Sequence, residues 1–245
     1  MFQDELARSG RKLFVIRGHF IRLLIFIGIG IAYQVRSLGP FSSDAANCVW
    51  FWSALAIAAT GALYRMYVNG HAANGTSSRI KEAAEAAELN TTGAYSMVRN
   101  PLYLGRILNF TGLAMLTGSA FYGMLIFFTS VLIYERISAY EENFLKEKFG
   151  AAHAKWAADV PALLPRFHGW TKPKYAFWWR RMFWREYKKV YQFGTALFFY
   201  EFARHGFDIE WLRGEPAIYI SYGVLTLLRI GCKGLKMSGF FADFR

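Results

Sequence analysis

The sequence has few cysteines and few charged residues, and both shortages limit what the protein can be. Only Cys48 and Cys232 occur among 245 residues, and they form no metal-binding or redox motif. Each is expected to be a small apolar side chain, so neither a disulfide nor a metal site is predicted. Charged residues make up 19% of the chain and apolar residues 54%. This composition is more apolar than that of an ordinary soluble domain and favours a membrane protein.

The charges that are present are mostly positive. Lys and Arg number 29 against 17 Asp and Glu, which gives a net charge of +12. An apolar chain with surplus cations suits a membrane protein that faces anionic lipid head groups. A basic chain can also bind nucleic acid. We do not predict a nucleic-acid partner, because the basic residues flank apolar segments and form no separate domain.

Four apolar segments predict an all-α, polytopic membrane helix bundle with about four main spans. They cover about residues 20–33, 48–68, 102–118 and 120–137, and the last two are expected to form a hairpin around residues 118–119. The connecting loops 37–47 and 117–123 carry no Lys or Arg, whereas the N-terminus and loop 65–100 carry many. The positive-inside rule therefore places the N-terminus and loop 65–100 on the cytoplasmic side.

The remaining segments give weaker patterns. An Ala- and Glu-rich stretch predicts a short surface helix over 79–89. Residues 143–170 predict a partly amphipathic helix, with His153 on the surface, followed by a proline-broken segment that folds back as a lid. Residues 1–170 are expected to form the transmembrane core, and 171–245 an aromatic and basic extension that is either interfacial or packed on the core. Within it, 177–188 predicts an interfacial helix, and the apolar runs 193–202 and 217–230 are short for membrane spans.

The stretch from Gly93 to Tyr103 is the most informative part of the chain. Pro101 is well placed for the first turn of a helix, where its missing N–H costs nothing. Arg99 and Asn100 stand directly before that start. A helix start carries unpaired N–H groups and partial positive charge, which favour anions. The arrangement suits a cofactor carboxylate or an anionic lipid head group.

A second block follows, with Glu141-Glu142, Phe149-Gly150, Val160-Pro161 and Leu164-Pro165. Together the two blocks resemble the isoprenylcysteine carboxyl methyltransferases and the related phospholipid methyltransferases, over roughly residues 45–170. Two positions depart from that pattern. Asn100 stands where the family has a histidine, and Ala87 stands where a second histidine is usual. Asparagine still forms hydrogen bonds but does not shuttle protons near neutral pH.

The resemblance implies an integral membrane methyltransferase that uses S-adenosylmethionine on a membrane lipid or lipid-linked acceptor. It implies a cofactor site formed by Tyr95, Arg99, Asn100, Pro101, Tyr103, Leu104, Glu141 and Glu142. Arg99 and Glu142 are the expected catalytic residues.

The identity of the acceptor stays open at the level of sequence. An anionic carboxylate or phosphate needs a cation to orient it, and Arg99 is the predicted group. A phospholipid amine needs a base, for which Glu142 is the alternative. The cationic, aromatic C-terminal extension favours the anionic acceptor. A non-enzymatic membrane scaffold or transporter is a further alternative.

Overall fold

The computed structural model describes residues 2–73 and 86–240, and all regular structure in them is helical. The predicted all-α class is therefore confirmed. The helices are α1 (Phe2–Val35), α2 (Asp44–His71), a 3-10 turn η1 (Gly93–Ser96), α3 (Pro101–Met115), α4 (Ala120–Asp159), α5 (Trp179–Arg204), α6 (Ile209–Gly214) and α7 (Pro216–Met237). The predicted surface helix over 79–89 lies mostly outside the described residues, and its last four residues, 86–89, are not helical.

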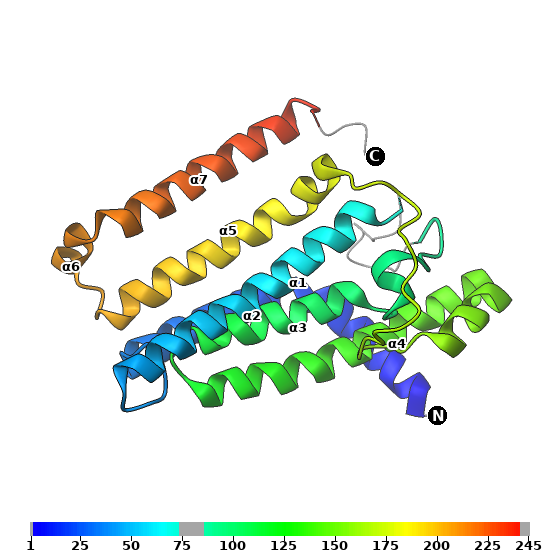
Figure 1. Cartoon of the computed structure of the whole chain (residues 1–245), viewed down its shortest axis with the longest axis horizontal. Coiled ribbons are helices and arrows are strands. Elements are labelled where there is room, and N and C mark those ends of the chain that lie inside the picture. The colour runs from blue at the N-terminus through cyan, green and yellow to red at the C-terminus, as the bar shows by residue number, and fades with distance from the viewer. Residues whose placement is uncertain (1, 74–85, 241–245) are drawn as a thin grey trace.

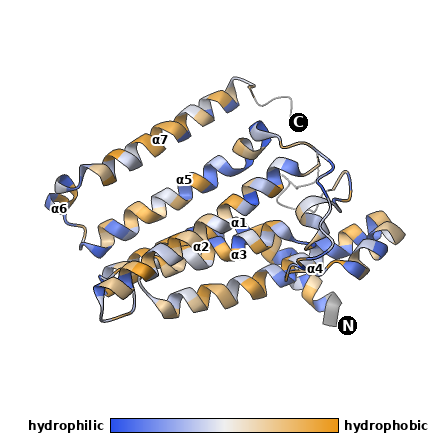
Figure 2. Cartoon of the chain, in the orientation of Figure 1, coloured by the Kyte–Doolittle hydropathy of each residue, from blue (hydrophilic) through white to orange (hydrophobic). Residues whose placement is uncertain are grey.

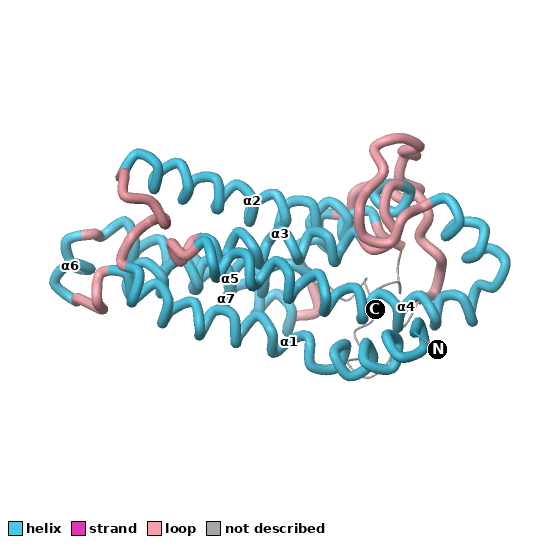
Figure 3. The backbone as a smooth tube through the Cα atoms, turned by 90° about the horizontal axis from the view of Figure 1, so that it is seen from below, coloured by secondary structure: helices cyan, strands magenta, loops and turns pink. Residues whose placement is uncertain are grey.

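The long helices run side by side along one axis, alternating in direction (Figure 1). Helix α1 packs on α4, α2 packs on α3, α5 lies against α1 and α2, and α7 packs on α5 from outside. Most loop segments lie at the two ends of the bundle (Figure 3). Hydrophilic residues gather around the end where α3 begins and α5 begins (Figure 2). The stretch Gly93 to Tyr103, hereafter the signature, therefore lies at a polar end of an otherwise apolar bundle.

Four helices are long and apolar enough to cross a membrane, but they are not the four that were predicted. They are α1 from Glu5, α2, α4 and α7. The predicted third span is α3, which has 15 residues and is about 22 Å long, against a hydrocarbon core of about 30 Å. The run 217–230, predicted to be too short, is part of the 22-residue helix α7. Polar residues at the ends of α7 hid its length in the sequence.

The helix predicted over 177–188 is longer in the structure than the sequence indicated, and its interfacial location stays a prediction. These residues lead into α5, a 26-residue helix that continues through the apolar run 193–202. The face of α5 that includes Ala196, Tyr200 and Ala203 is fully buried against the bundle. The helix is long because its charged first half finds buried polar partners at the signature end, as described below.

Helices α2 and α3 approach closely because glycines lie between them. A Cβ atom at Gly61 would be 2.5 Å from the backbone nitrogen of Asn109, and one at Gly112 would be 2.5 Å from that of Ala58. Such contacts are possible only without side chains, as is common where membrane helices pack. Asn109 Nδ2 also donates to the carbonyl of Ala58 at 3.0 Å. The tight pair fixes the position of α3, and hence of the signature that precedes it.

Helix α4 reverses direction at Gly150, whose φ and ψ are 49° and −120°. The last nine residues of α4 then return towards the signature and bring Trp156 against it. His153 lies on the returning part and is only 5% exposed. The prediction that His153 is a surface residue is therefore wrong. The amphipathic pattern was interpreted as one continuous helix, and the reversal changes which face is covered.

Replacing Gly150 with alanine is expected to destabilise the returning part of α4. This combination of φ and ψ is almost restricted to glycine, and the strain should cost roughly 1–3 kcal/mol. No atom lies within 4 Å of the added Cβ, so backbone strain is the whole effect. The measurement is the melting temperature of the protein in detergent, together with the rate of proteolysis within 151–159. Gly18→Ala in α1, which also has open space at its Cβ but ordinary helical geometry, is the control and should leave the protein as stable as the parent or more stable. Equal behaviour of the two variants would contradict the requirement at Gly150.

Candidate active site

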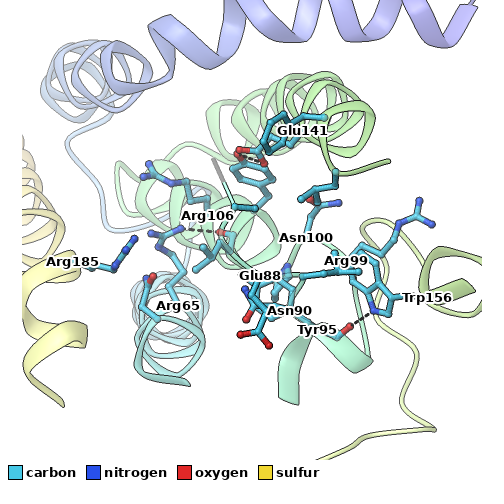
Figure 4. Close-up of a pocket in the computed structure, with 18 of the residues that line it drawn as sticks. Arg65, Glu88, Asn90, Tyr95, Arg99, Asn100, Arg106, Glu141, Trp156 and Arg185 are labelled. Atoms are coloured by element: carbon cyan, nitrogen blue, oxygen red, sulfur yellow. Dashed lines mark hydrogen bonds between the residues drawn. The ribbon is translucent and has the colours of Figure 1, made fainter. Parts of the chain in front are cut away.

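A cavity of about 280 Å³ opens beside the signature, at the polar end of the bundle (Figure 4). Its walls come from five helices, α1 to α5, and from the segment before α3. Of the eight predicted cofactor-binding residues, six line it: Tyr95, Arg99, Asn100, Pro101, Tyr103 and Glu141. Leu104 and Glu142 are not among the lining residues. The two motif blocks, some forty residues apart in sequence, thus meet at one cavity.

Helix α3 begins at Pro101, as predicted, with Asn100 as the residue before its first turn. The signature loop is held by the segment that follows α4. Arg99 N donates to the Pro161 carbonyl at 2.8 Å, Arg166 N donates to the Met97 carbonyl at 3.0 Å, and Gly93 N donates to the Thr171 carbonyl at 3.0 Å. The proline-broken segment therefore folds back onto the signature. Its action as a lid over a ligand stays a prediction.

Glu142 ties the signature to α4. Arg99 Nε donates to Glu142 Oε1 at 3.0 Å, and Arg99 NH2 lies 3.0 Å from Oε2, which is the two-pronged arrangement that guanidinium and carboxylate favour. Arg99 NH1 donates to the carbonyl of Ala157 at 2.8 Å, and Asn100 Nδ2 donates to Glu142 Oε1 at 3.0 Å. All three Arg99 nitrogens thus have protein acceptors. Arg99 and Glu142 support each other and the returning part of α4.

Glu141 points the other way, into the cavity. It accepts a hydrogen bond of 2.8 Å from the hydroxyl of Tyr103. The Tyr103 ring stacks on that of Tyr134, with centroids 4.8 Å apart and an angle of 21°. Consecutive carboxylates on one helix therefore have different surroundings. Glu142 is enclosed by the signature, and Glu141 is available to a ligand.

Tyr95 and Trp156 form an aromatic side of the cavity. Trp156 Nε1 donates to the backbone carbonyl of Tyr95 at 3.0 Å, and both residues line the cavity. Burial, with the nearby Glu141 charge, raises the pKa of the Tyr95 hydroxyl above its ordinary value. The hydroxyl therefore stays protonated and can donate a hydrogen bond. Trp156 was not predicted, because only the reversal at Gly150 brings it to the site.

A buried polar cluster lies next to the cavity and joins α2, α3 and α5. Arg65 NH2 and Glu186 Oε1 are 2.9 Å apart, and their side chains are 6% and 4% exposed. Asn69 Nδ2 and Lys189 Nζ each donate to the same oxygen at 2.7 Å, and Arg65 NH1 donates to the carbonyl of Leu102 at 2.8 Å. Burial raises the pKa of Glu186, but the attraction of Arg65 and Lys189 outweighs it and the pKa is lowered overall. Glu186 is therefore an anion held by two cations.

The cavity also contains cations that motif reasoning missed: Arg17, Arg65, Arg106, Arg185 and Lys189. The sequence did contain an indication of two of them. Arg65 and Arg106 lie in or beside apolar runs, where a charged residue is energetically costly and commonly functional. No such signal existed for Arg185 and Lys189, which lie in a strongly charged segment. Among the residues that the structure describes, no group of His, Cys, Asp and Glu could hold a metal ion.

The lining suits S-adenosylmethionine, which carries a carboxylate, an ammonium, a sulfonium and an adenine ring. Guanidinium groups suit its carboxylate, the Glu141 carboxylate suits its positive groups, and the aromatic side suits its ring or sulfonium. Each chemical feature of the cofactor thus has a matching side chain in the cavity.

Comparisons with known proteins agree with this description. The model of the phospholipid methyltransferase family matches residues 47–152, and the resemblance predicted from the two motif blocks is confirmed over that segment. The chain is also similar to the nickel-cobalt-cadmium resistance protein NccN of Alcaligenes xylosoxydans xylosoxydans, at 32% identity over 82 residues. Those residues are 34% of this chain and 38% of NccN, so the chain covers well under half of that relative. No solved structure matches the chain.

Proposed function

Because residues 47–152 match the phospholipid methyltransferase family, we propose that this chain is an integral membrane methyltransferase that uses S-adenosylmethionine on a membrane lipid or lipid-linked acceptor. The observation that carries the proposal is the meeting of the two motif blocks at one polar cavity in an apolar helical bundle. A scaffold or transporter would not require a cavity lined by Glu141 beside a signature loop that Glu142 holds in place.

Six residues would hold the cofactor directly: Tyr95, Arg99, Asn100, Pro101, Tyr103 and Glu141. S-adenosylmethionine supplies an activated methyl group, so the protein chiefly contributes positioning and electrostatics. Glu142 acts through Arg99 and Asn100, whose side chains it fixes at the cavity edge. In this proposal Arg99 is a positioning residue as well as a wall of the site, because all its nitrogens already have acceptors.

For the acceptor, an anionic group is our first candidate. The described cavity lining has more cations than carboxylates, and an anion gains from that balance. An amine acceptor is the second candidate, because Glu141 faces the cavity and is a better-placed base than Glu142. The Tyr103 hydroxyl bonded to Glu141 would keep that carboxylate in position in either case.

We place the active site on the cytoplasmic side, where S-adenosylmethionine is available. Two observations support this. The cavity lies at the end of the bundle where hydrophilic residues gather (Figure 2), and two of the three connections at the other end, 37–43 and 116–119, carry no Lys or Arg, while the third, 205–215, carries one, Arg213.

The proposed function is tested by cofactor binding and by product analysis. Calorimetry on the full chain in detergent should detect binding of S-adenosylmethionine. Mass spectrometry of lipids from cells with and without the protein should then find a species heavier by one methyl group. The chemical class of that species decides between the anionic acceptor and the amine. Absence of cofactor binding by folded protein would overturn the proposal and favour a scaffold or transporter.

A further inference from the structure

One side of the cavity carries a concentration of positive charge that the cofactor alone does not explain. Arg65 from α2, Arg106 from α3, and Arg185 and Lys189 from α5 line this side, which we call the basic wall. Figure 4 shows Arg65, Arg106 and Arg185 together on one side of the cavity, with Arg99 and Trp156 on the other. The basic wall and the signature thus face one space from opposite directions.

Three cations of the basic wall, Arg65, Arg106 and Lys189, have a single carboxylate among the ion pairs of the described residues. Glu186 is the carboxylate of the buried cluster, and it is shared by Arg65 and Lys189. Among the described residues Arg106 has no ion-pair partner, and its guanidinium lies 5.8 Å from the centroid of the Phe110 ring. Burial and then the Arg65 and Arg106 charges lower the pKa of Lys189, against the pull of Glu186. Like charges held this close favour a bound anion.

We propose that the basic wall is a subsite for the phosphate group of the lipid acceptor, an assignment that rests on the proposed methyltransferase function. Arg106 is the central contact, with Lys189 and Arg185 beside it. A phosphate presents several oxygens to donors that come from different helices, and arginine binds it in a two-pronged manner. The subsite would hold the lipid by its phosphate, whichever atom of the head group is then methylated.

The proposal also gives a role to the C-terminal extension. Arg185 and Lys189 belong to α5, which lies outside the matched segment 47–152. The buried cluster of Arg65, Asn69 and Glu186 fixes this helix against α2. The cofactor side would then be built by the matched segment, and the phosphate side jointly with α5. This division places acceptor recognition partly in sequence that lies outside the segment matched by the family model.

The test measures binding of three probes to the full chain in detergent. The probes are dihexanoyl phosphatidic acid, dihexanoylglycerol, which has the same acyl chains without the phosphate, and S-adenosylmethionine. The parent should bind the phosphate-bearing lipid at least about tenfold more tightly than the diacylglycerol. Arg106→Gln should weaken phosphatidic acid binding by roughly tenfold or more, as expected for loss of one charged hydrogen bond, and leave S-adenosylmethionine affinity unchanged. Lys155→Gln, on an exposed part of α4, is the matched charge control and should bind all probes like the parent.

Four results would overturn the assignment. Equal affinity for the two lipids would show that the phosphate is not recognised. Equal binding of phosphatidic acid by Arg106→Gln and the parent would remove Arg106 from the subsite. Loss of S-adenosylmethionine binding in Arg106→Gln would instead assign the basic wall to the cofactor carboxylate. An effect of Lys155→Gln as large as that of Arg106→Gln would indicate general surface charge. If the parent fails to bind S-adenosylmethionine but binds the phosphate, the proposed methyltransferase function fails and the subsite stands as a lipid-binding site.

Discussion

Replacing Glu186 with alanine is expected to lower the free energy of unfolding by about 3–5 kcal/mol, the largest stability effect predicted for this protein. Glu186 is 3% exposed and is the shared acceptor of Arg65, Asn69 and Lys189. Its removal leaves Arg65 buried without a counter-charge beside a second cation. Thermal and denaturant unfolding of the detergent-purified protein measures the effect.

Two further variants distinguish the effect of breaking the buried Arg65–Glu186 ion pair from the effect of losing a charge in general. Glu215→Ala, at the exposed start of α7, should unfold like the parent. The double variant Arg65→Met with Glu186→Leu removes both buried charges, and should recover most of the stability lost by Glu186→Ala. If Glu186→Ala is as stable as the parent, Glu186 does not fix α5 to α2. The basic wall would then lack its structural support.

Replacing Glu142 with alanine is expected to weaken S-adenosylmethionine binding by roughly tenfold to hundredfold. The substitution removes the acceptor of Arg99 Nε, Arg99 NH2 and Asn100 Nδ2. Loss of charged hydrogen bonds of this kind costs about 1.5–3 kcal/mol, and we expect the cost to appear as disorder of residues that line the proposed cofactor site. Calorimetry with S-adenosylmethionine measures the change, and Glu147→Ala, exposed one and a half turns further along α4, is the control.

Arg99→Lys distinguishes the two roles considered for Arg99. Lysine keeps the charge but loses the planar fork that binds Glu142. If Arg99 positions Glu142, cofactor affinity should fall in the same direction as in Glu142→Ala. If Arg99 instead orients an anionic acceptor, turnover should fall with cofactor affinity unchanged. Unchanged affinity in both Arg99→Lys and Glu142→Ala would remove the Arg99–Glu142 pair from the cofactor site.

The motif residues were predictable because each depends on local chemistry. Pro101 begins a helix because its ring fixes φ and lacks an N–H, and the helix does begin there. Glu141 and Glu142 were recognised from their spacing to other motif residues. The spacing did not reveal that the Glu141 side chain faces the cavity whereas the Glu142 side chain faces Arg99 and Asn100. That depends on how α4 is rotated against α3, which is set by the packing of Tyr103 on Tyr134.

The features that the sequence did not predict lie in segments whose environment is set by distant residues. His153 and Trp156 are buried because of the reversal at Gly150, a single backbone position inside a helical pattern. Helix α5 was interpreted as interfacial because its aromatics and cations are typical of a membrane surface. In the structure, Glu186 pairs with Lys189 on the same helix and with Arg65, which is 121 residues away from Glu186 in sequence. No local pattern identifies such a pair.

The sequence by itself determined the all-helical membrane class, the family resemblance and six of the residues that line the cavity. These follow from composition, apolar length and a short motif, all of which are local properties. Only the tertiary structure decided which helices are long enough to span, which glutamate faces the cavity, and that α5 adds a basic wall. The physical reason is that burial and charge pairing depend on which helices pack together, and that packing is settled by small residues and buried ion pairs far apart in the chain.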